Sequence, residues 1–268
     1  MMREFPFDTG TVTLNIAEGP RNGPLLLMLH GFSNRWQTLW PLIEPLSAHY
    51  HILTYDQRGH GKSGRVPGGY TAAGFYEDLL AVVRRFVDSP AIFIGHSMGG
   101  AIALHLAVDH PQRVRAVAAG DASLDTSVHI AVMNNRRNTK LFGLRRKLAG
   151  RALDDLLRRG LPPDSAEELS LLDPSVMDYH ADGRVEGFFV DIPNVNVTRI
   201  RCPHLIVQAN PAKGGLLQDE EVSRALAARP DLNILRLDAA HDLDLACGVD
   251  SPFFIHLNSW LQSLNLRS

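Results

Sequence analysis

The chain has 268 residues, of which 45% are hydrophobic and 21% are charged. This length and composition are enough to bury a large core in one domain. The formal net charge is -2, from 27 basic and 29 acidic residues, so there is no electrostatic reason to expect nucleic acid or an anionic membrane as a partner. The first residues lack the apolar core of a signal peptide, and no run of about 18 apolar residues predicts a membrane span.

The two cysteines, Cys202 and Cys247, have no metal-ligand spacing. We expect two free thiols in a reducing compartment, and therefore a cytoplasmic protein. The histidines are not accompanied by a third ligand at a suitable spacing, so neither a metal nor a cofactor is predicted. Composition leaves the oligomeric state open.

Short apolar runs alternate with helical patterns along most of the chain. The expected helices are 37–47, 71–86, 98–110, 220–228 and 253–264, and the expected strands are 11–16, 25–29, 51–55, 91–94, 115–120, 204–208 and 232–237. The central strands are apolar throughout, which is typical of a sheet covered by helices on both faces. The alternation predicts a mostly parallel α/β sheet, with the first strand antiparallel at its edge.

Residues 122–198 break this alternation, since they contain no convincing strand and their leucines recur at roughly helical spacing. We predict a helical cap over 122–198, laid on a core formed by residues 1–121 and 199–268. Arginines on such a helix are expected on a solvated face, although they could instead bind an acidic substrate. The arginines concerned are Arg136, Arg137, Arg145, Arg146, Arg151, Arg158 and Arg159.

The stretch Gly95-His96-Ser97-Met98-Gly99 lies between an apolar strand and a helix rich in small residues. This is the strand–turn–helix context of a G-x-S-x-G nucleophile elbow. The glycines let strand and helix approach each other, and the strained turn lifts the Ser97 hydroxyl above the sheet. The helix N-terminus offers backbone N–H groups where negative charge would develop. The pattern therefore predicts a serine nucleophile.

Two further segments accompany the elbow. Residues 25–32 form a buried strand that ends in His30-Gly31-Phe32, and residues 55–64 follow the next strand with a glycine-rich turn. In this order and spacing the three features resemble the α/β-hydrolase family, from residue 25 to the final helix. The resemblance implies an eight-stranded, mostly parallel sheet flanked by helices, a helical cap between strands six and seven, and the chain order serine, acid, histidine.

The same features predict the oxyanion hole, the base and the structural residues around them. The backbone N–H groups of Phe32 and Met98 can meet to form an oxyanion hole, and Asp56 and His60 resemble structural positions of the family's turn. His241 is the expected base, because it alone among the 12 histidines follows the final strand and precedes the final helix. His96 is expected to pack in the elbow and His30 to brace the oxyanion loop.

The acid has two candidate positions. The family's common position follows strand seven, where this chain has Asn210. An amide cannot stabilise an imidazolium, and in a serine protease triad the change from Asp to Asn costs about 10⁴ in rate. Asp219 lies further along this loop and is expected to be a helix N-cap. Asp121 ends strand six, where haloalkane dehalogenases and some cofactor-free oxygenases of this fold keep their acid; its alternative role is to bond loop amides. We predict Asp121 as the acid, with Asp219 as the alternative.

Together these residues predict a serine hydrolase, similar to a carboxylesterase, that cleaves a small-molecule ester, thioester, amide or C–C bond through an acyl-enzyme. A haloalkane dehalogenase is disfavoured, because it needs a carboxylate in place of Ser97. Two alternatives remain open. One is a lyase or cofactor-free oxygenase that uses mainly the His–Asp pair, and the other is a ligand-binding receptor on the same fold, which Asn210 alone suggests.

Overall fold

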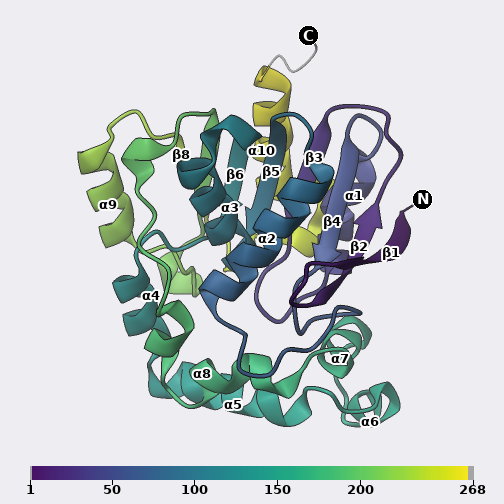
Figure 1. Cartoon of the computed structure of the whole chain (residues 1–268). Coiled ribbons are helices and arrows are strands. Elements are labelled where there is room, and N and C mark those ends of the chain that lie inside the picture. The colour runs from purple at the N-terminus through teal and green to yellow at the C-terminus, as the bar shows by residue number, and fades with distance from the viewer. Residues whose placement is uncertain (1, 265–268) are drawn as a thin grey trace.

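Figure 1 presents the computed structural model of the chain, which describes residues 2–264. Eight strands form one sheet in the order β1-β2-β4-β3-β5-β6-β7-β8. The strands are β1 (Arg3–Asp8), β2 (Thr13–Glu18), β3 (Leu25–Leu29), β4 (His51–Asp56), β5 (Ala91–His96), β6 (Val114–Gly120), β7 (His204–Gln208) and β8 (Ile234–Arg236). Pairing is antiparallel between β1 and β2 and between β2 and β4, and parallel elsewhere. The predicted eight-stranded, mostly parallel sheet is confirmed. The first predicted strand, 11–16, corresponds to β2 and is antiparallel as expected, but its predicted place at the edge is wrong, because β1 pairs with its outer side. Strand β1 was missed because its residues are only partly buried.

Helices cover both faces of the sheet. They are α1 (Trp40–Leu46), α2 (Ala72–Phe86), α3 (Met98–Asp109), α9 (Asp219–Ala228) and α10 (Pro252–Ser263), with short 3-10 helices η1 (Trp36–Leu39), η2 (Pro111–Arg113), η6 (Pro211–Lys213) and η7 (Leu245–Asp250). One buried cluster joins α2 and α3 to the face that is toward the viewer in Figure 1, and a second joins α1 and α10 to the opposite face. Within residues 2–264, no helix is both long and apolar enough to cross a membrane. Both cysteines are free.

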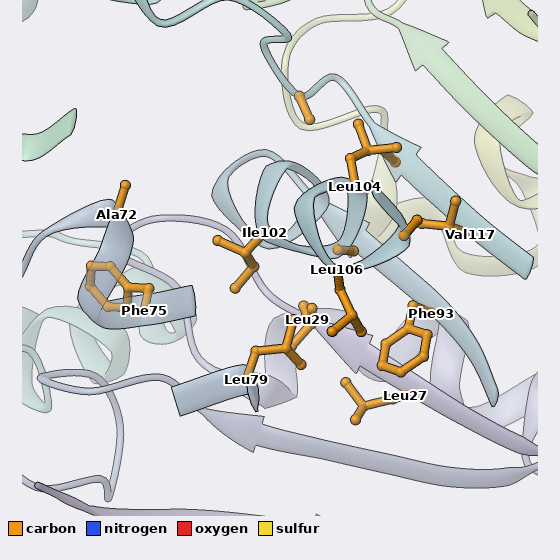
Figure 2. Packing of buried hydrophobic residues seen from close by; sticks show 14 of the residues in the cluster. Leu27, Leu29, Ala72, Phe75, Leu79, Phe93, Ile102, Leu104, Leu106 and Val117 are labelled. Atoms are coloured by element: carbon orange, nitrogen blue, oxygen red, sulfur yellow. The ribbon is translucent and has the colours of Figure 1, made fainter. Parts of the chain in front are cut away.

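Helix α3 is the centre of the first cluster. Figure 2 shows Leu106 pointing toward Leu27 and Phe93 on the strands beneath, while Ile102 faces Leu29 and the side chains of α2. Almost all of α3 is buried, as expected for a helix that is apolar on every side. The helix that follows Ser97 is therefore fixed by packing along its whole length.

The segment between β6 and β7 contains no strand among its residues, as predicted. It forms helices α4 (Thr126–Met133), α5 (Arg136–Leu148), α6 (Leu153–Arg158), α7 (Pro163–Ser170) and α8 (Asp178–Ala181), and 3-10 helices η3 (Pro174–Met177), η4 (Val185–Phe189) and η5 (Val197–Arg199). Helices α5 to α8 lie across one end of the sheet (Figure 1). We call residues 122–198 the cap; its division from the core as a subdomain remains a prediction.

The leucines of the cap do not all face inward. Leu156 is fully buried, but Leu141 and Leu144 on α5 are 51% and 55% exposed, and Leu153 and Leu157 are also exposed. The helical spacing of these residues was thus a correct sign of helices. It did not identify the side of α5 that faces the rest of the protein.

The buried carboxylate of Glu221 fastens the start of the cap to α9. Its Oε1 atom accepts hydrogen bonds from Ser123 Oγ at 2.6 Å and from the backbone N–H groups of Leu124 and Asp125 at 2.8 and 3.0 Å. Its Oε2 atom accepts from the Gln218 N–H at 2.9 Å. One side chain therefore holds the point where the chain leaves β6 for the cap.

We expect Glu221→Ala to lower the free energy of unfolding by about 3 kcal/mol, because it leaves buried N–H groups without an acceptor. The matched control is Glu220→Ala on the same turn, whose side chain is 73% exposed beside Arg224 and should change stability by less than about 0.5 kcal/mol. Urea unfolding of both variants measures the difference. Equal stabilities would contradict the bracing role of Glu221.

The turn after β4 is held by the Asp56 carboxylate and by two buried histidines. Asp56 accepts hydrogen bonds from the backbone N–H groups of Trp36 and Lys62 and from Asn15 Nδ2, each at 3.0 Å. His30 donates from Nδ1 to the Gly31 carbonyl and accepts the Gln57 N–H at Nε2. His60 donates from Nδ1 to the Arg58 carbonyl and accepts the Ser33 N–H at Nε2. Both imidazoles use their two nitrogens as a neutral ring does, and they fix the segment from His30 to Ser33.

Burial lowers the pKa of His30 to about 4 and the pKa of His60 to about 3. An unfolded histidine takes up a proton near pH 6.5, so between pH 6.5 and about 4 the unfolded chain binds more protons than the folded one. The stabilisation is full above pH 6.5 and is lost as the pH falls through this range. We expect the free energy of unfolding to drop between pH 7.5 and pH 5 by about 2 kcal/mol for each such histidine.

Urea unfolding at pH 7.5, 6 and 5 measures this loss. His60→Asn should make the pH dependence shallower, because one buried imidazole is removed, whereas the exposed His49→Asn should leave it unchanged. A slope that is the same in His60→Asn as in the wild type would contradict the neutral state of His60.

Candidate active site

Ser97 occupies the sharp turn between β5 and α3, with a positive φ of 53°. A Cβ atom on Gly95 would collide with the Gly99 carbonyl oxygen, and one on Gly99 would collide with the Leu29 carbonyl oxygen. Both glycines of the elbow are thus required by the close approach of strand and helix, as predicted. Strain of this kind is characteristic of functional positions.

His241 lies between Ser97 and Asp121. Its Nε2 atom is 3.0 Å from Ser97 Oγ and its Nδ1 atom is 2.6 Å from Asp121 Oδ2. His96 is buried beside it and donates from Nε2 to the His241 carbonyl oxygen at 2.7 Å. The predicted packing role of His96 therefore includes holding the backbone of the base. The structure brings Ser97, His241 and Asp121 together in one hydrogen-bonded series.

The Asp121 carboxylate is fully buried at the end of β6, where the residue has a positive φ of 44°. Besides His241 it accepts three backbone N–H groups: Oδ1 accepts from Ala209 at 3.1 Å and from Leu217 at 3.2 Å, and Oδ2 accepts from Leu216 at 2.7 Å. These donors fix the orientation of the carboxylate toward His241. The same carboxylate thus bonds the loop amides and the imidazole, and its role as the catalytic acid stays a prediction.

Asn210 and Asp219, the two residues of the β7 loop considered in relation to the acid, do not contact His241. Asn210 bonds Asp238 through its Nδ2 atom and accepts the Ala212 N–H, so its amide shapes a turn. Asp219 accepts a hydrogen bond from Gln208 Nε2 at 2.9 Å. The prediction that Asp219 is an N-cap is wrong by one residue: α9 begins at Asp219, and Gln218 is the cap, in a capping box with Glu221.

Phe32 and Met98, the predicted oxyanion-hole residues, lie on the two loops that meet at Ser97. A Cβ on Gly31 would lie 3.2 Å from the Ser97 Cβ, so the two loops touch. Met98 begins α3, and its N–H therefore has no acceptor within the helix. Within residues 2–264 the Phe32 and Met98 N–H groups have no protein acceptor. Both remain available to an oxyanion, and this role stays a prediction.

A cavity of about 320 Å³ opens above Ser97, between the core and the cap. Its walls include Phe142 of α5, His180 of α8 and Phe188 of η4, which surround the Phe32 ring with centroids 4.7–6.0 Å from it. A narrower and mainly apolar cavity of about 50 Å³ shares Ser97 and Met98 as walls and extends along Ile102 and Ile192. Small-molecule sites in proteins have comparable dimensions and linings.

The polar lining contributed by the cap was not predicted as a site. Arg145 is half-buried and lines the larger cavity, with Glu168 and His180 nearby on its wall. The expectation of a solvated face is therefore wrong for Arg145, although Arg136, Arg137, Arg151, Arg158 and Arg159 are exposed as predicted. Nothing in the local sequence separates Arg145 from its neighbours, because the direction of its side chain is set by how α5 lies on the core. Among the residues described, no three His, Cys, Asp or Glu side chains are grouped to hold a metal ion.

The chain is similar to known hydrolases over part or all of its length. It is 36% identical over 114 residues to 2-(acetamidomethylene)succinate hydrolase of Mesorhizobium japonicum, covering 42% of this chain and 41% of that protein. It is 38% identical over 109 residues to the AB hydrolase superfamily protein YfhM of Bacillus subtilis, covering 39% of this chain and 38% of that protein. The aligned segments thus span less than half of these relatives.

The fold is also shared by solved structures. The crystal structure of E-2-(acetamidomethylene)succinate hydrolase superposes with a TM-score of 0.71 at 22% identity, covering 98% of this chain and 100% of that one. The family model described as alpha/beta hydrolase fold matches residues 24–185, more than half of the chain. The chain belongs to the α/β-hydrolase fold family.

Proposed function

We propose that the protein is a hydrolase that cleaves an ester, thioester, amide or C–C bond of a small molecule, with Ser97 as nucleophile, His241 as general base and Asp121 as the acid. The observation that carries the proposal is the hydrogen-bonded series from Asp121 through His241 to Ser97, with distances of 2.6 and 3.0 Å. The distances lie within the reach required for proton transfer between nucleophile and base. The hydrolase name of the Mesorhizobium japonicum relative is consistent with the same class of reaction.

In the first half of the reaction, Ser97 Oγ attacks the substrate carbonyl carbon while its proton passes to His241 Nε2. The imidazolium so formed is stabilised by the Asp121 carboxylate at Nδ1, and the oxyanion is bound by the N–H groups of Phe32 and Met98. His241 Nε2 then gives its proton to the leaving group, and the acyl group stays on Ser97. In the second half, water attacks the acyl-enzyme and one of its protons passes to His241 Nε2. His241 then returns a proton to Ser97 Oγ as the carboxylic acid product leaves.

The hydrogen-bonded series from Asp121 through His241 to Ser97 also helps to choose between an enzyme and a receptor, and between a hydrolase and a lyase or oxygenase. A receptor needs neither a nucleophile in a strained turn nor a base held at both nitrogens, so these features favour an enzyme. A lyase or oxygenase that used only the His–Asp pair would not depend on the Ser97 hydroxyl. Removal of that hydroxyl therefore separates the proposed reaction from both alternatives.

Ser97→Ala should abolish covalent labelling by a fluorophosphonate probe and lower the hydrolysis of p-nitrophenyl esters by at least about 10³-fold, because no acyl-enzyme can form. Ser223→Ala, an exposed serine on α9, is the matched control and should label as the wild type does. Intact-mass spectrometry and ester kinetics provide the measurements. Normal turnover in Ser97→Ala would favour a reaction that does not use the serine.

Asp121→Asn should lower kcat by about 10²–10⁴-fold at neutral pH, because the imidazolium loses its counter-charge. Asp219→Asn is the matched control: it removes a carboxylate that bonds Gln208 and not His241, so kcat should stay within about threefold. Steady-state kinetics are compared at equal folded fraction, checked by circular dichroism. If Asp219→Asn is inactive while Asp121→Asn is near the wild type, the acid is misassigned. Asn210→Asp should not raise the rate of the wild type.

A further inference from the structure

Arg145 directs a guanidinium into the larger cavity from the last turn of α5. Its one hydrogen bond with the described residues joins Nη2 to Ser33 Oγ at 3.0 Å. Its Nε atom is buried and has no partner within residues 2–264. Arg146, the next residue, instead pairs with Asp178 at 3.1 Å and Asp182 at 2.8 Å on the outer side of the cap.

The charged groups around Arg145 do not neutralise it by contact. Within residues 2–264 no carboxylate lies within 4.0 Å of its nitrogens, although Glu168 is close enough to act on it through space. The Oε1 atom of Glu168 already accepts hydrogen bonds from Thr38 Oγ1 at 2.6 Å and Asn34 Nδ2 at 3.3 Å. Asp242 is exposed and lies beside His241 on the same cavity.

Burial lowers the pKa of Arg145, against the opposing effect of Glu168. A guanidinium remains charged in proteins, so its burial without a close counter-ion costs free energy that an anionic or strongly accepting ligand would offset. A carboxylate matches the fork of guanidinium N–H groups and can accept two of them at once. The Nδ1 atom of His180, also buried and without a partner among the described residues, lies on the same cavity.

The Arg145 guanidinium lies in the same cavity as Ser97 and close to the proposed oxyanion hole. Ser33, which it contacts, follows Phe32, whose N–H belongs to the proposed oxyanion hole. Arg145 and Ser97 line one cavity of about 320 Å³. A ligand held by the guanidinium would therefore extend toward Ser97 within the length of a small molecule.

We propose that Arg145 binds a carboxylate carried by the substrate, so that the enzyme acts on acyl compounds with a free carboxylate at the end away from the scissile bond. This inference rests on the proposed function only for the position of the scissile bond. The binding of the carboxylate by Arg145 is independent of the proposed function. Arg145 acts here as a substrate-binding residue that selects for charge.

The kinetic test compares two series of substrates of equal chain length. Mono-p-nitrophenyl esters of succinic, glutaric and adipic acids carry the carboxylate, and p-nitrophenyl esters of butyric, pentanoic and hexanoic acids lack it. In the wild type, kcat/KM should be higher for the anionic member of at least one pair. Arg145→Met should lower the ratio of kcat/KM between anionic and neutral members by about 10²-fold, as expected for the loss of a charge-assisted hydrogen-bonded pair.

Arg146→Met is the matched control, since this neighbour is not among the residues that line the cavity and pairs with Asp178 and Asp182. It should leave the ratio unchanged. Arg145→Lys, which keeps the charge but not the fork, should give an intermediate ratio. A wild type that prefers the neutral esters, or a ratio unaffected by Arg145→Met, would overturn the inference while leaving the hydrolase proposal intact.

A binding measurement separates the two proposals and avoids dependence on turnover. Glutarate is titrated by calorimetry into Ser97→Ala protein and into the double variant that adds Arg145→Met, each checked for folding by circular dichroism. Glutarate should bind the first at least about 10-fold more tightly than the second. If the wild type cleaves no ester and Ser97 does not label, but glutarate binding depends on Arg145, the hydrolase proposal fails and the carboxylate site stands. Equal binding to both variants, or no binding to either, would remove the carboxylate site.

Discussion

The Asp121 carboxylate connects the end of β6, the loop after β7 and the loop that carries His241. It accepts three backbone N–H groups and one imidazole N–H while fully buried. The loop after β7 turns back to deliver Leu216 and Leu217 to this carboxylate, and its geometry explains its composition: Gly214 has a φ of 94°, and a Cβ on Gly215 would collide with the Ala209 carbonyl oxygen. The loop after β7, whose Asn210 does not contact His241, therefore binds the carboxylate at the end of β6.

The histidines of the site have separate roles that follow from burial. His30 and His60 each donate from one nitrogen and accept at the other, which a protonated ring could not do, so they serve as neutral braces for the segment from His30 to Ser33. Burial also lowers the pKa of His96 to about 4, and this ring holds the backbone of His241. His241 alone bonds both Ser97 and Asp121. His30, His60 and His96 therefore fix the backbone around Ser97 and His241.

Helix α5 of the cap departs from the usual relation between polarity and burial. Leu144 is exposed, while Arg145, the next residue, reaches the cavity together with Phe142. The helix covers a binding space and not a packed core, so burial of apolar side chains alone does not set its orientation. The cap is held at its origin by Glu221, and its aromatic residues Phe142 and Phe188 rest on Phe32. In the proposed reaction, the cap would select the substrate and the core would cleave the bond.

The sequence by itself determined the sheet, the covering helices, the elbow around Ser97 and the place of His241. Each of these features depends on contiguous residues. The strands are apolar runs, the elbow has glycines at fixed spacing, and His241 lies in the loop between the last strand and the last helix. Strand β1 was not predicted, because a partly buried edge strand has few of the apolar residues by which a strand is recognised. The hydrogen-bond partner of His241 depends on which groups at the ends of several strands meet at one edge of the sheet. Only the tertiary structure decided that this partner is Asp121 and not Asp219. It likewise decided that Arg145 enters the cavity, since the rotation of α5 on the core is set by contacts between residues far apart in the chain.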